Sequence, residues 1–217
     1  MKARELFMKK KIMVSFAAFT AVLAIAAAVA IGIGVSRNTE KSANYDLPGV
    51  VAGDGVLALI DARVSTKEFS EKPIDRQITA EILWTAFGKN SRGKRTIPTS
   101  RNQQNLNVYL VTADGMWLYD GMKNQLVRRS HEDLRPVFAT QDYVLKAPIT
   151  LLYTGTDEVN SPIHAGSAYQ NVALYAVEKG LGTVVRSHFD KDAVKAAFNL
   201  PADEFPITSQ TIGWPAE

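Results

Sequence analysis

Residues 165–186, AGSAYQNVALYAVEKGLGTVVR, place a long helical segment directly before a short β-prone one. We predict a helix over 165–179 that ends at Gly180, because glycine adopts the left-handed conformation that commonly closes a helix. The β-branched run that follows predicts a strand over 182–186. This stretch therefore indicates a domain that mixes helices with strands.

Elements on either side of this stretch complete the map of the fold. Ile74, Ile78 and Ile82 recur at helical spacing, and Gly88 suits the left-handed position after a helix. The pair Asp114-Gly115 predicts a tight hairpin turn. We predict helices over 74–87 and 190–198, the second capped by Asp190, and strands over 107–112, 116–120, 125–128, 148–153 and 207–213. Because strands and helices do not alternate strictly, we expect an α+β fold.

The net positive charge of the chain resides in its first 37 residues. The whole sequence has 217 residues and a formal charge of +3. Residues 1–37 hold six of the 25 Lys and Arg residues and one of the 22 acidic residues, which leaves 19 basic and 21 acidic residues. The rest of the chain is thus mildly acidic, which removes the main electrostatic argument for nucleic-acid binding.

Residues 12–35 contain no charged side chain in 24 positions and are rich in Ala, Val and Ile. A helix with a rise of about 1.5 Å per residue would cross a hydrocarbon core of about 30 Å over this length. Three lysines at 9–11 favour a cytoplasmic N-terminus and an extracytoplasmic domain. We therefore predict a signal anchor within 1–37. A cleaved signal peptide is the alternative, since Ala-Val-Ala at 28–30 offers a cleavage pattern, and the domain would then be secreted or periplasmic.

Polar and turn-forming residues interrupt any periodicity over 38–50, which predicts a linker before a folded domain over 51–217. The sequence contains no cysteine, which excludes disulfides, thiolate metal sites and a cysteine nucleophile. His131, His164 and His188 are scattered without metal-ligand spacing, so we expect no metal site.

The run RVSTKEF at 63–69 is the first candidate for ligand binding. Arg63, Ser65 and Lys67 occupy alternate positions, and in an extended segment their side chains point the same way. A guanidinium, a hydroxyl and an ammonium together can satisfy a phosphate by charge-assisted hydrogen bonds. Taken alone, the run is better explained as a solvated polar face of a strand.

Two further runs offer groups suited to a flat heterocycle. In PTSRNQQ at 98–104, the amides of Asn102 and Gln104 carry donors and acceptors for a ring edge, although a polar turn explains the run better in isolation. The run GLGT at 180–183 lacks the order and the third glycine of a dinucleotide fingerprint. Its glycines allow a ligand to approach the backbone closely, and a plain helix stop at Gly180 is the alternative.

Taken in order along the chain, these runs and a closing Gly-Trp-Pro at 213–215 resemble the FMN-dependent nitroreductase family, over roughly residues 58–215. Within that family the chain is similar to the branch that includes peptide azoline oxidases. That similarity lies in ILWTAFG at 82–88, GTVVR at 182–186, the Gln-Asn pair at 170–171 and the Gln-Thr pair at 210–211. The resemblance implies an α+β fold in which a central, mostly antiparallel sheet is flanked by helices.

The same resemblance implies that FMN lies at the interface of a homodimer. The phosphate would be held at 63–67, the ring or ribityl chain would face the amides at 102–104, and the segment at Gly166 would approach from the other subunit. The implied cofactor-binding residues are Arg63, Ser65, Lys67, Asn102, Gln104, Gly166, Gly180, Leu181 and Gly182. The flavin performs the chemistry, so no catalytic side chain is expected. NAD(P)H would reduce it, and a nitroaromatic, quinone or similar acceptor would then take the same place in a ping-pong cycle.

Three departures from the family pattern bear on function. The sequence ends at Glu217, before a basic residue that many relatives add to the phosphate site, and Val64 replaces a basic or polar residue. We therefore expect weaker FMN binding. No adjacent Lys-Tyr pair is found, which argues against peptide ring oxidation. The alternative function is a non-catalytic, membrane-tethered module of the same fold that binds flavin or a partner, since reduced nicotinamides are scarce outside the cytoplasm.

Overall fold

The computed structural model describes residue 50 and residues 52–216. The predicted signal anchor at 1–37 and the predicted linker at 38–50, apart from residue 50, lie outside the described residues and stay predictions. Within the described part of the chain, no helix is both long and apolar enough to cross a membrane.

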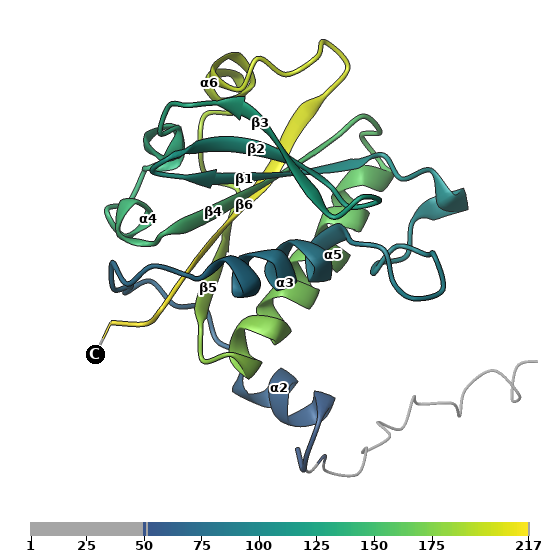
Figure 1. The fold of residues 1–217 in the computed structure, drawn as a ribbon, viewed down its shortest axis with the longest axis vertical. Helices are drawn as coiled ribbons and strands as arrows, with labels where there is room; N and C mark the ends of the chain where they lie inside the picture. The colour runs from purple at the N-terminus through teal and green to yellow at the C-terminus, as the bar shows by residue number, and fades with distance from the viewer. Residues whose placement is uncertain (1–49, 51, 217) are drawn as a thin grey trace, which may run out of the picture. The chain divides into compact units, whose positions relative to one another are not determined.

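The described residues build one six-stranded sheet in the order β3-β2-β1-β4-β6-β5, in which all neighbouring strands are antiparallel (Figure 1). The strands are β1 Leu106–Thr112, β2 Gly115–Asp120, β3 Gln125–Ser130, β4 Ile149–Gly155, β5 Gly182–Arg186 and β6 Phe205–Gly213. The sheet and its flanking helices confirm the predicted α+β class. Every predicted strand is present, and β5 has the predicted bounds.

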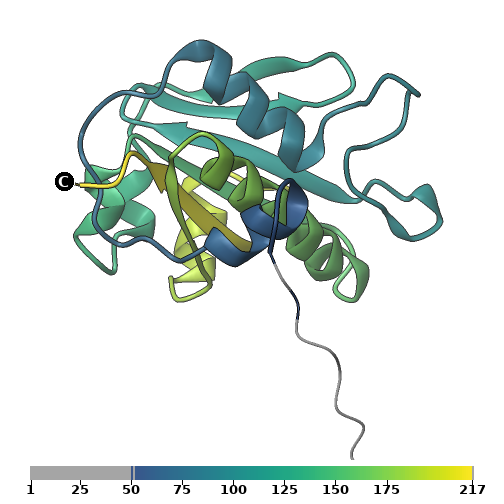
Figure 2. The same cartoon turned by 90° about the horizontal axis from the view of Figure 1, so that it is seen from below.

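Helices cover both faces of this sheet (Figures 1 and 2). Alternate residues of β1 explain how both faces become buried, since successive side chains of a strand point to opposite sides. Val108 and Leu110 join the core beneath α3 and α5, whereas Tyr109 and Val111 join the core beneath η2, α4 and α6. The helices are α2 Val56–Ala62, α3 Arg76–Phe87, η1 Ser100–Asn102, η2 Arg135–Phe138, α4 Tyr143–Lys146, α5 Asn160–Glu178 and α6 Lys191–Ala197.

The long helix α5 begins at Asn160, five residues before the predicted start at 165. Asp157 explains the early start, because its Oδ1 accepts the free N–H groups of Val159 and Asn160 at 2.9 and 2.8 Å. At its other end, Gly180 has φ +71°, and the Leu181 N–H donates to Ala176 O at 2.8 Å. The predicted left-handed helix stop at Gly180 is therefore confirmed.

Two predicted roles of glycine are wrong in detail. Gly88 follows α3 with φ −74° and is not left-handed. A Cβ there would lie 2.5 Å from Trp84 Cδ1, so close packing is what requires glycine. In the hairpin, Thr112 pairs with Gly115, so the turn residues are Ala113 and Asp114 and Gly115 already belongs to β2. Its φ of +134° explains why glycine stands at this strand start.

Candidate functional site

The segment that carries the RVSTKEF run is extended and lies along the outer edge of β5. Ser65 forms an isolated parallel bridge with Thr183, and the Thr66 N–H donates to Thr183 O at 3.0 Å. Farther along, Phe69 forms an antiparallel bridge with Pro215 near the C-terminus. The segment is therefore fixed at both ends, once by β5 and once by the last residues of the chain.

Gly182 makes the close contact between this segment and β5 possible. A Cβ on Gly182 would lie 2.6 to 2.8 Å from three side-chain atoms of Thr66, closer than real atoms approach. The predicted approach of a flat ligand to these glycines stays a prediction, and among the described residues the group that lies against Gly182 is Thr66. Gly180 acts as the helix stop, and Leu181 is buried in the core beneath α3 and α5.

Arg63 and Ser65 line one cavity of about 200 Å³ between the extended segment, α5 and β5. The remaining lining residues are Tyr169, Gln170, Ala173, Thr183 and Val185. Among the described residues Arg63 forms no salt bridge, so its charge has no protein counter-charge there. Lys67 is exposed and does not line this cavity. Two of the three predicted phosphate-binding side chains are thus brought together.

A buried hydroxyl supports the assignment of an anion to this cavity. The side chain of Thr183 is buried, and its Oγ1 has no hydrogen-bond partner among the described residues. Buried hydroxyls are nearly always hydrogen-bonded, whereas this one keeps its donor and acceptor capacity unused within the described residues. A guanidinium and two hydroxyls suit the several acceptor oxygens of a phosphate, and the residues present therefore fit the phosphate of FMN.

The predicted ring-binding amides lie outside the Arg63 cavity, on a strained segment. Arg101, Asn102 and Gln104 all have positive φ, at 50°, 56° and 52°. Each such backbone conformation costs on the order of 1 kcal/mol and persists only where the surroundings impose it. Here Gln104 Nε2 donates to Asn102 Oδ1 at 3.2 Å, and Arg95 Nε donates to Gln104 Oε1 at 2.8 Å.

His164 anchors this strained segment to α5. The Ser100 N–H donates to His164 Nε2 at 2.8 Å, so Nε2 is the acceptor and the ring proton lies on Nδ1. Nδ1 lies 2.8 Å from Asn105 Oδ1, which it therefore donates to. Burial lowers the pKa of His164, and the charge of Asp157 opposes that shift. Sequence reasoning missed this anchor because its partners are about 60 residues away along the chain.

Helix α5 links the two groups of predicted residues. The strained segment docks at Asn160 and His164, whereas the Arg63 cavity contacts α5 from Tyr169 to Ala173. Gly166 lies between them, and a Cβ there would come no closer than 3.7 Å to Tyr169. Within one chain, the phosphate-binding pair and the segment that carries the amide pair therefore meet α5 at different turns and on different sides of the helix.

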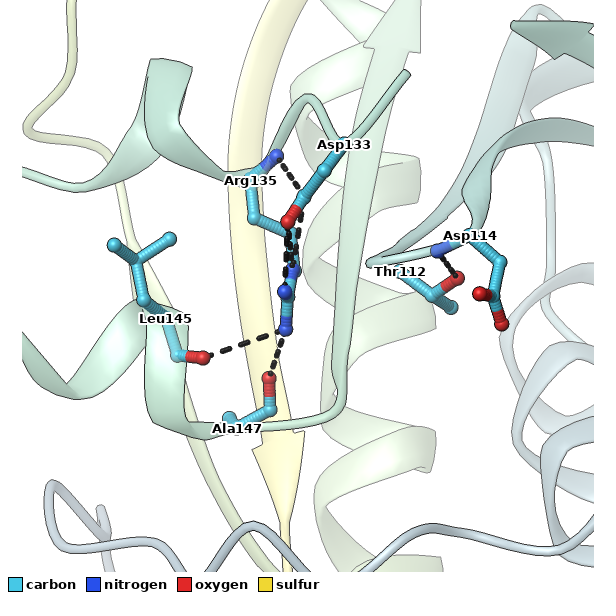
Figure 3. A network of polar contacts seen from close by, with 6 residues as sticks. All are labelled: Thr112, Asp114, Asp133, Arg135, Leu145 and Ala147. Carbon is cyan, nitrogen blue, oxygen red and sulfur yellow. Dashed lines mark hydrogen bonds and ion pairs between the residues drawn. The ribbon is translucent and has the colours of Figure 1, made fainter. Parts of the chain in front are cut away.

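A larger cavity of about 510 Å³ is lined by Arg135 and also by Lys146, which forms no salt bridge among the described residues. The Arg135 guanidinium pairs with Asp133 at 2.7 Å and also donates to the carbonyls of Leu145 and Ala147 (Figure 3). Protein acceptors already engage this cation, which fixes η2 to the turn after α4. We assign the candidate site to the Arg63 cavity because an unpaired guanidinium lines it together with two hydroxyl residues, one of which, Thr183, has no hydrogen-bond partner among the described residues.

Comparisons with known proteins agree with this architecture. The nitroreductase family model matches residues 60–214. A protein assigned as a nitroreductase from Ralstonia eutropha JMP134 is 31% identical, with a TM-score of 0.72 over 79% of this chain and 88% of that one. No curated protein matches the chain at a significant level.

Two more distant structures show the same fold. One is from the Escherichia coli microcin synthetase McbBCD complex, at 16% identity and a TM-score of 0.63, covering 82% of this chain and 80% of that one. The other is an NADH dehydrogenase/NAD(P)H nitroreductase from Parabacteroides distasonis, at 16% identity and a TM-score of 0.58, covering 74% and 87%. The family match spans most of the described residues, and the chain belongs to the nitroreductase family.

Proposed function

We propose that the protein is an FMN-dependent oxidoreductase that passes electrons from NAD(P)H to a nitroaromatic, a quinone or a similar acceptor in a ping-pong cycle. The observation that carries this proposal is the cavity lined by Arg63, Ser65 and Thr183, in which Arg63 has no salt-bridge partner among the described residues and the Thr183 hydroxyl has no hydrogen-bond partner. When bound there, FMN supplies the redox chemistry, which no side chain of the described residues needs to perform.

The residues of the chain bind and orient the cofactor in this proposal. Arg63 and Ser65 hold the phosphate by charge-assisted hydrogen bonds, and Lys67, two residues farther along the same extended segment, is exposed and adds positive charge to that segment. The strained backbone at 101–104 presents the amides of Asn102 and Gln104 in one fixed arrangement, which suits recognition of a ring or ribityl chain.

A homodimer accounts for the separation within one chain of the phosphate-binding pair, Arg63 and Ser65, from the amide pair, Asn102 and Gln104. The Arg63 cavity, at about 200 Å³, is smaller than the roughly 300–1,000 Å³ of typical cofactor sites, and a second copy would enlarge it. Val56, Leu57 and Ile60 on α2 and Trp84 on α3 are exposed apolar side chains that a second copy would cover. That copy would bring its own Gly166 segment to the ring. Sedimentation analysis of the purified protein tests the dimer directly.

The azoline-oxidase-like branch is the part of the family in which we place the chain. Support comes from the quoted motifs, and the likeness to a microcin synthetase subunit is one of fold alone. The missing Lys-Tyr pair argues that peptide ring oxidation is not the reaction. An activity screen with a thiazoline-containing peptide beside a nitroaromatic checks this, and we expect turnover of the nitroaromatic only.

We further propose an extracytoplasmic location, with the N-terminal segment at 12–35 as an uncleaved anchor or as a cleaved signal. The supporting feature is the run of 24 uncharged residues after three lysines. An external domain would draw electrons from a membrane quinol or a redox protein where reduced nicotinamides are scarce. Protease digestion of intact and permeabilised cells distinguishes the two sides of the membrane.

The alternative is a non-catalytic module that binds flavin or a partner. Two observations favour it: Lys67 lies outside the cavity, and Gln104 is already engaged by Arg95 and Asn102. Visible absorption spectra of the full chain in detergent, with FMN and then NADPH, separate the possibilities. Enzyme function predicts a bound flavin that NADPH bleaches rapidly and an acceptor reoxidises. A protein that binds no FMN contradicts the main proposal, and bound flavin that resists every reductant supports the alternative.

A further inference from the structure

The hydroxyl of Thr183 is a polar group without a structural role. Thr183 is 6% exposed, and its Oγ1 has no hydrogen-bond partner among the described residues. Its backbone carbonyl already accepts the Thr66 N–H, so the main chain holds the residue in place without help from the side chain. A buried hydroxyl left in this state destabilises a protein, and native structures seldom keep one without a reason.

The position of Thr183 distinguishes it from the other unpartnered hydroxyls. Within the described residues, Thr96, Thr150 and Thr211 also lack partners for Oγ1. Thr150 and Thr211 are register partners on β4 and β6, and neither lines the Arg63 cavity. Of these four residues, Thr183 alone lines that cavity, together with Arg63 and Ser65.

We propose that the Thr183 hydroxyl donates a hydrogen bond to the phosphate held by Arg63 and Ser65, and so helps the site select phosphorylated over unphosphorylated flavin. This inference rests on the proposed function. Thr183 and Ser65 lie opposite each other in the isolated bridge, so their hydroxyls come from two facing backbones. Gly182 preserves that spacing by allowing Thr66 to lie against β5. A phosphate between them offers enough acceptor oxygens for both hydroxyls and for the guanidinium.

Isosteric replacement of Thr183 provides the test, because Thr183→Val removes the hydroxyl and keeps the shape. The full chain would be titrated with FMN and with riboflavin, and binding followed by quenching of flavin fluorescence. We expect FMN binding to weaken by about 10- to 100-fold, the range for losing a hydrogen bond to a charged group. Riboflavin binding should not change, and Thr183→Ser should keep FMN affinity near that of the unmodified protein.

A stability measurement separates ligand binding from a structural role. Thr183→Val removes an unsatisfied buried hydroxyl, so the melting temperature of the flavin-free protein should stay constant or rise. Thr211→Val is the matched control, since it removes another unpartnered hydroxyl and should leave both flavin affinities unchanged. If the valine variant does not fold, Thr183→Ala replaces it in the same titrations.

Each remaining outcome identifies what has failed. Unchanged FMN affinity in Thr183→Val, beside normal binding by the unmodified protein, overturns the role of Thr183 and leaves the proposed function standing. Equal weakening of FMN and riboflavin overturns the phosphate contact. Failure of the unmodified protein to bind either flavin overturns the proposed function itself.

Discussion

Replacing Gly182 with alanine should push the phosphate-binding segment away from β5. The new Cβ would lie 2.6 Å from Thr66 Cγ2, 2.7 Å from Thr66 Cβ and 2.8 Å from Thr66 Oγ1. Rotation about χ1 of Thr66 relieves the first and third contacts but cannot move Cβ, which is attached to the backbone. The main chain at Thr66 must therefore retreat.

The size of the displacement follows from the contacts. Ordinary van der Waals contact begins near 3.4 Å, so Thr66 Cβ, which side-chain rotation cannot move from its 2.7 Å contact, must retreat by about 0.7 Å. A retreat of that size takes the bond from the Thr66 N–H to Thr183 O, now 3.0 Å, beyond hydrogen-bonding range. Overpacking of this kind costs about 1–3 kcal/mol of unfolding free energy. Because Arg63 and Ser65 move with the segment, we also expect FMN affinity to fall about tenfold or more.

Two other glycines provide matched controls for Gly182→Ala. Gly180 has φ +71° with nothing within 4 Å of a Cβ, so Gly180→Ala should cost about 1–2 kcal/mol through backbone strain while leaving FMN affinity intact. Gly53 has neither strain nor close neighbours, so Gly53→Ala should change nothing. Urea unfolding and FMN titration measure both quantities in all three variants. If Gly182→Ala behaves like Gly53→Ala in both assays, the argument from close approach is refuted.

Three further predictions concern single side chains. Burial lowers the pKa of His164 from its ordinary 6.5, so its neutral form stabilises the fold fully above pH about 6.5, and this contribution is lost as the pH falls toward the folded pKa. Urea unfolding at pH about 8 and about 5 measures how much unfolding free energy is lost on acidification. This loss should be smaller in His164→Gln than in the unmodified protein, and equal losses would contradict the role of the ring. Arg63→Gln should weaken FMN binding about 10- to 100-fold by titration, with unfolding free energy changed by less than about 0.5 kcal/mol; a large loss of stability would show that Arg63 is structural. Asp190 Oδ1 accepts the N–H groups of Asp192 and Ala193 at 3.0 Å, so Asp190→Ala should cost about 1 kcal/mol in thermal unfolding and Asp190→Asn much less.

Much of the fold was predictable because its signals are local. The stop at Gly180, the strand β5 and the cap at Asp190 each depend on residues adjacent in sequence, and all three are confirmed. The helices α2 and α4 were missed because seven and four residues are too few to show a helical period and, unlike the seven-residue helix α6, neither has a side-chain cap to mark its start. The first turn of α5 was missed because its stabilising acceptor, Asp157, lies before the apolar pattern begins.

The candidate site was predictable only in part because it joins distant segments. The alternation of Arg63, Ser65 and Lys67 identified the right segment, yet only the first two line the cavity. The neighbours that complete the cavity, Thr183 and Val185, come from a strand more than 100 residues later. The alternation predicted which way the side chains point, whereas the parallel bridge to β5 decides what they face.

The location of the cavity at β5 also solves a problem of sheet edges. In the described sheet β5 is an outer strand, paired with β6 on one side only. An outer strand leaves N–H and C=O groups that another chain could pair with, unless something covers them. The segment with Arg63 and Ser65 covers this edge through the single bridge at Thr183 and then turns away toward Pro215. The same short contact therefore covers part of this edge and lies beside the cavity, which Ser65 and Thr183 both line. A substitution that lengthens the pairing between this segment and β5 should consequently close the cavity as it protects the edge.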